Sequence, residues 1–111
     1  MIFEAFDVVV VPFPFTDRRA SKRRPALVLS GGKVFNTPAG HLVLAMITSA
    51  ENAPWPLDTP LTDLAGAGLP VPSLVRMKLF TLDAGLVLRR AGTLGKADRK
   101  AVRAALSRLL G

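Results

Sequence analysis

The sequence contains no cysteine and a single histidine, and each shortage removes a class of chemistry. Without cysteine the chain forms neither disulfides nor thiolate zinc sites, and a reducing cytosol is the simplest compartment for it. His41 stands alone and the carboxylates are not clustered, so we expect neither a catalytic metal nor a cofactor. His41 itself is predicted to be a loop residue. These absences favour a cytoplasmic protein that uses its own side chains for any chemistry.

Long apolar runs and nucleotide-binding motifs are also missing. No stretch approaches the roughly 20 apolar residues that cross a bilayer, and residues 1–4 lack the basic region that opens a signal peptide. We therefore expect no membrane partner. Gly31 and Gly32 do not have the spacing of a phosphate-binding loop, and no G-x-S-x-G motif is present. Nucleotide hydrolysis and acyl transfer are excluded on these grounds.

Positive charge, in contrast, is in excess. The 15 lysines and arginines outnumber 8 acidic residues, which gives a formal charge of +7 and an isoelectric point near 11.2. A polyanionic partner is therefore plausible, although charge alone does not separate RNA from DNA or from an anionic membrane. A chain of 111 residues forms one domain, which we place at 1–111. Half of its residues are hydrophobic, which leaves apolar surface for a partner, most simply a second copy of the chain.

The apolar segments predict a mainly β fold. Residues 8–11 are four consecutive valines, and this lack of alternation indicates a strand covered on both faces. Pro12 and Pro14 cannot donate to a ladder, so the second half of that strand is expected at an edge. The whole pattern favours a small barrel-like sheet capped by a C-terminal helix. Strands are predicted over residues 7–15, 25–30, 41–49, 57–61, 73–82 and 86–90, with loops over 33–40 and 63–72 and one helix over 95–110.

The basic stretch over residues 21–30 carries the first candidate site. Pro25 fixes its own backbone and pushes Arg24 into an extended conformation at the start of a buried strand. A guanidinium on such a rigid base is well suited to hold a phosphate through two parallel hydrogen bonds. A solvated basic loop is the alternative, which the residues alone leave open. The cationic side chains beside Arg24 are Arg18, Arg19, Lys22 and Arg23.

Two hydroxyls at the end of the strand predicted over 41–49 supply a second candidate. RNA carries its own nucleophile, the 2′-hydroxyl, so a protein can cleave it by holding the phosphate in line and stabilising the added charge. Arg24 is suited to stabilise that charge, and Thr48 to bond a phosphate oxygen, but neither is an evident proton acceptor. Alternatively, Thr48 and Ser49 simply end the strand. Trp55 is suited to stack on a base, or to make a core or dimer contact.

Four segments together resemble the MazF/PemK family, the toxin halves of type II toxin–antitoxin pairs. The resemblance implies a homodimeric SH3-like barrel of the CcdB/MazF type. It also implies an endoribonuclease, an mRNA interferase that cleaves single-stranded RNA at short sequences without metal and leaves 2′,3′-cyclic phosphate and 5′-hydroxyl ends. An acidic antitoxin protein is the further implied partner. The matching segments are residues 7–15, 22–30, 45–49 and 69–76.

The same resemblance assigns roles to individual residues. Arg24 and Thr48 match the catalytic pair, and Ser49 and Arg76 are possible catalytic support. Lys78 stands where some members carry an acid–base carboxylate. This departure keeps open a non-catalytic barrel that binds RNA or a peptide. A gyrase-poisoning toxin of the same fold ranks lower, because such toxins end in Trp-Gly-Ile whereas this chain ends in Leu-Leu-Gly. The expected RNA-binding residues are Arg18, Arg19, Lys22, Arg23 and Trp55.

Overall fold

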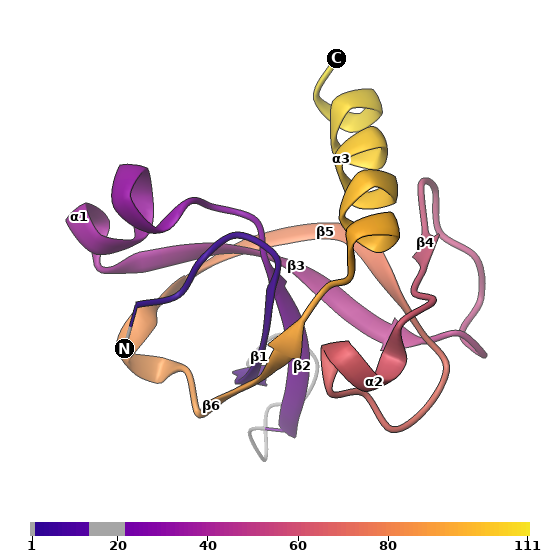
Figure 1. The fold of residues 1–111 in the computed structure, drawn as a ribbon, viewed down its shortest axis with the longest axis horizontal. Helices are drawn as coiled ribbons and strands as arrows, with labels where there is room; N and C mark the ends of the chain where they lie inside the picture. The colour runs from indigo at the N-terminus through magenta and orange to yellow at the C-terminus, as the bar shows by residue number, and fades with distance from the viewer. Residues whose placement is uncertain (1, 14–21) are drawn as a thin grey trace.

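A six-stranded antiparallel sheet organises the molecule (Figure 1). The computed structural model describes residues 2–13 and 22–111. The strands lie in the order β4-β5-β3-β2-β1-β6, and the sheet is curled into a half-barrel. This confirms the mainly β, barrel-like prediction. The strands are β1 (Asp7–Phe13), β2 (Lys22–Val28), β3 (His41–Ser49), β4 (Thr59–Pro60), β5 (Ser73–Asp83) and β6 (Arg89–Thr93).

Helical segments connect and cover the strands, and several of them were not predicted. The expected C-terminal helix is confirmed, but the loops expected over 33–40 and 63–72 contain helical turns. Gly40 and Gly68 adopt the left-handed conformation that ends such turns, and the Asp63 carboxylate accepts a 2.9 Å hydrogen bond from the Gly66 amide at the start of one. Among the described residues, no helix has both the length and the apolar character needed to span a membrane. The segments are η1 (Gly32–Asn36), α1 (Thr37–Ala39), α2 (Leu64–Ala67), η2 (Ala84–Leu86) and α3 (Lys96–Leu110).

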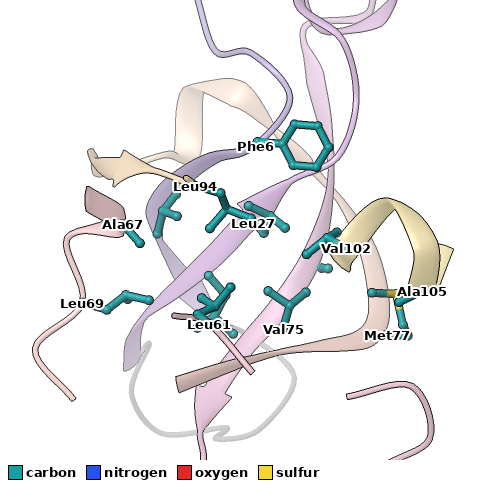
Figure 2. Packing of buried hydrophobic residues seen from close by; sticks show 13 residues of the cluster. Phe6, Leu27, Leu61, Ala67, Leu69, Val75, Met77, Leu94, Val102 and Ala105 are labelled. Carbon is teal, nitrogen blue, oxygen red and sulfur yellow. The ribbon is translucent and has the colours of Figure 1, made fainter. Parts of the chain in front are cut away.

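Apolar clusters cover both faces of the sheet. Val8 belongs to one cluster and Val9 to the other, and both are fully buried, as the run of valines predicts. The cluster drawn in Figure 2 lies on what we call the first face, where α3 contributes Val102 and Ala105. The opposite side of the sheet is the second face. Its buried members are Phe3, Val9, Val11, Ala26, Val28, Leu42, Leu44 and Leu82.

The prolines fall where the strands lack a second neighbour. Pro12 is paired with Arg23 on β2, but β6 is paired with β1 only as far as Val10, so the second half of β1 is an edge as predicted. β2 begins at Lys22, three residues before the predicted start, because β1 offers partners there. Pro25 lies opposite Val10 and outside the β2–β3 ladder, so its missing N–H breaks no bond to β3.

A close backbone approach joins β6 to the segment around α2. A side chain at Gly92 would place its Cβ 2.3 Å from the Gly66 carbonyl oxygen, so only glycine permits this contact. The last strand was predicted over residues 86–90 but runs from Arg89 to Thr93. The shift arises because Asp83 accepts a 2.8 Å hydrogen bond from the Gly85 amide and turns the chain into η2 before β6 can pair with β1.

α3 is attached to the sheet through a buried carboxylate in its first turn. Asp98 is 2% exposed and accepts hydrogen bonds of 2.8–3.1 Å from the Thr62 amide and hydroxyl and from the Asp63 amide. Burial raises the pKa of this carboxyl, but the hydrogen bonds lower it more, and the net pKa lies below the ordinary value. The helix then rises away from the sheet (Figure 1), and Leu110 at its end is 75% exposed.

We expect Asp98→Asn to lower the free energy of unfolding at pH 7 by about 1–3 kcal/mol, because a neutral amide replaces an ionised acceptor. A folded-state pKa below the unfolded value means that the wild-type advantage is present above about pH 4 and is lost as the pH falls through the folded pKa. Urea unfolding from pH 7 to pH 2 measures it. Glu51→Gln, at an exposed carboxylate, is the control. A difference that stays constant across this pH range would contradict the assignment.

Candidate functional site

The two predicted catalytic residues lie just beyond the last printed pair of the β2–β3 ladder, one on each strand. The β2–β3 ladder pairs Leu27 with Ala45 and ends with Ala26 opposite Met46. Continuing the same register by two residues sets Arg24 opposite Thr48, where the strands are no longer paired. Because alternate residues share a face, both side chains belong to the second face, one row beyond its apolar cluster.

Arg24 is half-buried and lies on β2 next to β1. It is paired with Val11 of β1, and Val11 is fully buried. Its Nε is buried and has no hydrogen-bond partner among residues 2–13 and 22–111. Leaving a buried donor without an acceptor costs about 1–3 kcal/mol of stability, so a hydrogen bond from this N–H to an anionic oxygen would be favourable.

Thr48 is buried, with 6% of its surface exposed, and its hydroxyl is already engaged. Asn52 donates a 2.5 Å hydrogen bond from Nδ2 to the Thr48 Oγ1. With a lone pair of the oxygen occupied, the hydroxyl hydrogen is left to donate to another acceptor. Ser49 follows on the strand and therefore points to the opposite face, where its Oγ accepts a 3.3 Å hydrogen bond from the Glu51 amide.

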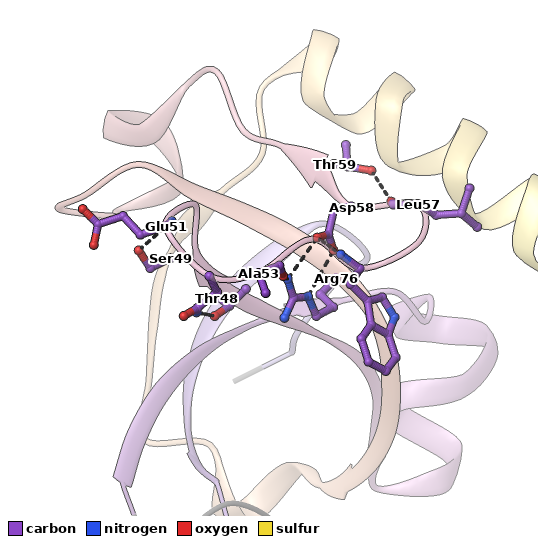
Figure 3. A network of polar contacts seen from close by, with 10 residues as sticks. Thr48, Ser49, Glu51, Ala53, Leu57, Asp58, Thr59 and Arg76 are labelled. Carbon is purple, nitrogen blue, oxygen red and sulfur yellow. Dashed lines mark hydrogen bonds and ion pairs between the residues drawn. The ribbon is translucent and has the colours of Figure 1, made fainter.

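Arg76 anchors the connection between β3 and β4 (Figure 3). It lies opposite Met46 and so shares the second face with Arg24 and Thr48. Its Nε donates to Asp58 Oδ1 at 3.1 Å and its Nη2 to Asp58 Oδ2 at 3.0 Å, while Nη2 also donates to the Ala53 carbonyl at 2.8 Å. The side chains of Arg76 and Asp58 are only 12% and 14% exposed, so solvent screens this pair weakly.

The positive charge of Arg76 is thereby paired with the carboxylate of Asp58. The hydrogen bond to Asp58 raises the pKa of the Arg76 guanidinium, while burial lowers it, and the net shift is upward. The group stays protonated at every working pH, with Nε and Nη2 both occupied. Arg76 therefore holds the segment over residues 50–58 against β5.

Trp55 lies at the surface of this segment. The side chain is 42% exposed, so it is not a core residue. The Arg76 guanidinium carbon lies 5.8 Å and the Lys78 Nζ 5.1 Å from the centre of its ring, within the range of cation–π attraction. Lys78, which by the resemblance stands where some family members carry a carboxylate, thus borders an exposed aromatic ring.

The remaining predicted residues are not gathered at this site. Arg23 is exposed and belongs to the first face, where it lines a hollow of about 350 Å³ together with Arg89. His41 is exposed at the start of β3, the end away from Thr48, and not in a loop; its Nδ1 lies 2.9 Å from the Ala39 carbonyl oxygen. Lys22 begins β2. Arg18 and Arg19 lie outside the described residues, so their predicted role is not addressed.

Sequence reasoning missed Asn52 and Asp58. Asn52 follows Thr48 by four residues in a turn, a spacing that gives only a weak signal. Asp58 pairs with a residue 18 positions away, which no local pattern reports. Within residues 2–13 and 22–111, no group of three or more His, Asp or Glu side chains is arranged to hold a metal ion.

The curled antiparallel sheet with its C-terminal helix is the fold of the MazF toxins, and comparison with known proteins identifies the family. The family model of PemK-like, MazF-like toxins of type II toxin–antitoxin systems matches residues 4–110, and the chain belongs to this family. No curated protein sequence matches it.

Solved structures share the whole fold. MazF from Deinococcus radiodurans is 26% identical, with a TM-score of 0.77 over 100% of this chain and 98% of that one. A MazE–MazF complex from the same organism is 25% identical, with a TM-score of 0.77 over 100% and 97% of the two chains. A mycobacterial endoribonuclease in complex with its cognate antitoxin is 17% identical, with a TM-score of 0.77 over 98% and 95%; at that identity the likeness concerns the fold alone.

A double-mutant cycle of Arg76→Ala and Asp58→Ala is expected to give a coupling energy of about 0.5–3 kcal/mol, because the two-bond ion pair is largely shielded from water. Urea unfolding of the four proteins measures it. The pair of Asp7 and Arg90, 3.2 Å apart with Arg90 40% exposed, is the matched control and should couple by less than about 1 kcal/mol. Equal coupling in the two cycles would show that Arg76 does not anchor residues 50–58.

Proposed function

We propose that this protein is a metal-independent endoribonuclease that cleaves single-stranded RNA as the toxin of a type II toxin–antitoxin pair. The observation that carries the proposal is that Arg24 and Thr48 lie on one face of the neighbouring strands β2 and β3, two residues beyond their last pair, and that the buried Arg24 Nε has no partner among the described residues. Membership in the MazF-like toxin family supports it. The positive net charge of +7 suits an RNA substrate and activity in the cytoplasm.

The geometry suggests how the two side chains divide the work. A phosphate between the strands would accept hydrogen bonds from the Arg24 guanidinium and from the Thr48 hydroxyl, whose orientation Asn52 sets. The 2′-oxygen loses its proton and attacks phosphorus, which forms a 2′,3′-cyclic phosphate and breaks the bond to the 5′-oxygen. The 5′-oxygen takes up one proton and leaves as a 5′-hydroxyl, so no proton is gained or lost overall. Arg24 stabilises the charge that builds on the phosphoryl oxygens, as preorganised donors do. Ser49, on the opposite face, is left with no direct part.

Incubating the purified protein with long RNA in EDTA is the direct test. We expect cleavage, with 2′,3′-cyclic phosphate and 5′-hydroxyl ends, and no cleavage where the attacking 2′-hydroxyl is replaced by hydrogen. Arg24→Ala should lower kcat by about 100- to 1000-fold, because one transition-state donor is lost. Arg108→Ala, at an exposed arginine of α3, is the matched control and should leave the rate unchanged.

One outcome would contradict the proposed cleavage, and another only the part assigned to Arg24. RNA left intact by a folded wild-type protein would favour the second candidate, a barrel that binds RNA or a peptide without cutting. Lys78 favours that candidate, because it stands where, by the resemblance, some family members carry an acid–base carboxylate. Near-normal cleavage by Arg24→Ala would instead keep the nuclease and remove Arg24 from its centre.

We further propose that the chain works as a homodimer and is silenced by an acidic antitoxin protein. Exposed Leu109 and Leu110 on α3 offer apolar surface for a second copy, and solved relatives include MazE–MazF complexes. An acidic segment would complement the net positive charge. Sedimentation at micromolar concentration should give a dimer, and an added antitoxin should stop RNA cleavage. A monomer would contradict the first part, and tight antitoxin binding with undiminished cleavage the second.

A further inference from the structure

We propose that residues 50–58 and β5 form a nucleobase-binding subsite, in which the exposed ring of Trp55 stacks on one unpaired base of the RNA and Lys78 attracts the adjoining phosphate. In this inference, which rests on the proposed RNA-cleaving function, Arg76 and Asp58 are positioning residues. They hold the ring in place and do not touch the reacting atoms.

The first observation is the state of Trp55 itself. Exposing a large part of an indole to water forgoes favourable burial, so an exposed tryptophan bordered by cations calls for a partner. The ring lies beside Arg76 and Lys78, and these two cations differ. Arg76 is neutralised by Asp58, whereas Lys78 is exposed and its charge is available to a phosphate.

The second observation is that the ring stands on a fixed base. The Trp55 amide donates to Asp58 Oδ2 at 2.9 Å, and the Asp58 amide donates back to the Trp55 carbonyl at 3.2 Å. Arg76 holds the same carboxylate and also the Ala53 carbonyl (Figure 3). Between them, Leu57 adopts a left-handed conformation with φ of 65°, which a bulky residue keeps only when its surroundings impose it. A ring fixed in advance loses little freedom when a base stacks on it.

The third observation is continuity with the proposed cleavage site. Asn52, which contacts the Thr48 hydroxyl, precedes Trp55 by three residues. Three residues span at most about 11 Å, so the ring lies within a few nucleotides of a phosphate held by Thr48. Arg76 shares the second face with Arg24 and Thr48.

These features favour single-stranded RNA over a protein partner for this subsite. An aromatic platform with an adjacent free cation is the combination that binds unpaired nucleotides, through stacking on the base and attraction to the backbone. A second copy of the chain, itself basic, would bring more positive charge toward Lys78.

Trp55 is the only tryptophan of the chain, so its fluorescence reports on this site alone. A random-sequence pool of RNA 12-mers with 2′-fluoro groups is the probe, because it lacks the attacking hydroxyl and is not cut. We expect saturable quenching on addition of the pool. Trp55→Ala should weaken binding of the labelled pool by about 5- to 150-fold, the range found for loss of one stacking aromatic. Lys78→Ala should weaken it less and flatten its salt dependence.

Matched controls come from η1, which runs directly into α1, and Figure 1 shows α1 at the other side of the molecule from β4. Phe35→Ala and Lys33→Ala also remove an exposed aromatic ring and an exposed lysine, and should change binding less than twofold. If RNA does not quench the Trp55 fluorescence, the subsite is overturned. If the fluorescence changes instead when the protein is diluted, as on dissociation of a second copy, the ring contacts protein and not RNA. An equal loss in Trp55→Ala and Phe35→Ala would overturn it as well.

The positioning role has its own readout. Asp58→Asn and Arg76→Lys should make the Trp55 ring more accessible to acrylamide and raise KM for RNA cleavage several-fold more than they lower kcat. A merely stabilising pair would move the free energy of unfolding without moving KM in the folded protein, and that result would overturn the role.

The subsite and the proposed function fail separately. Cleavage without quenching would keep the nuclease and remove the subsite. Quenching without cleavage would keep the subsite on an RNA-binding barrel that does not cut.

Discussion

The end of the β2–β3 ladder is the constraint on which the candidate site depends. Beyond Ala26 and Met46 the two strands stop pairing with each other, yet each keeps its other neighbour. Arg24 is still paired with Val11 of β1, and Thr48 with Leu74 of β5, so both residues stay on ordered strands. β2 and β3 themselves are not paired with each other at these two residues. Pro25 lies at this point and has no N–H to extend the ladder. β1 and β5 thus hold Arg24 and Thr48 in place where β2 and β3 are no longer paired with each other.

The two arginines of the second face, Arg76 and Arg24, differ in whether a hydrogen-bonding partner lies beside them. Arg76 has an aspartate within 3.0 Å, and its guanidinium serves the architecture of residues 50–58. Arg24 has a buried Nε with no acceptor in the described part of the chain. The two arginines on this face therefore differ in what they can offer a ligand. The Arg76 Nε and Nη2 are already engaged, whereas the Arg24 Nε has no acceptor in the described part of the chain. This difference, and not charge alone, is why our proposal places the phosphate at Arg24.

Local patterns predicted most of the framework. The strand over 41–49 was predicted at its observed bounds, and the helix over 95–110 to within one residue, because a long apolar run and a helical stripe leave few alternatives. The run Val8 to Val11 predicted burial on both faces, and both clusters confirm it. Short segments were less well predicted. The strand expected over 57–61 is reduced to Thr59–Pro60, and α2 replaced part of a loop, because a few residues take the conformation that tertiary contacts impose.

By itself the sequence determined that the chain is basic, that it has a mainly β fold with a C-terminal helix, and that Arg24 and Thr48 are the candidates for phosphate chemistry. These properties depend on composition, periodicity and short motifs, which are local. Only the tertiary structure decided that Arg24 and Thr48 lie on the same face of neighbouring strands, that Arg23 turns to the other face, and that Asp58 neutralises Arg76. Each depends on the pairing of strands or on contacts between residues far apart in the chain. A shift of one residue in that pairing would reverse which side chains share a face.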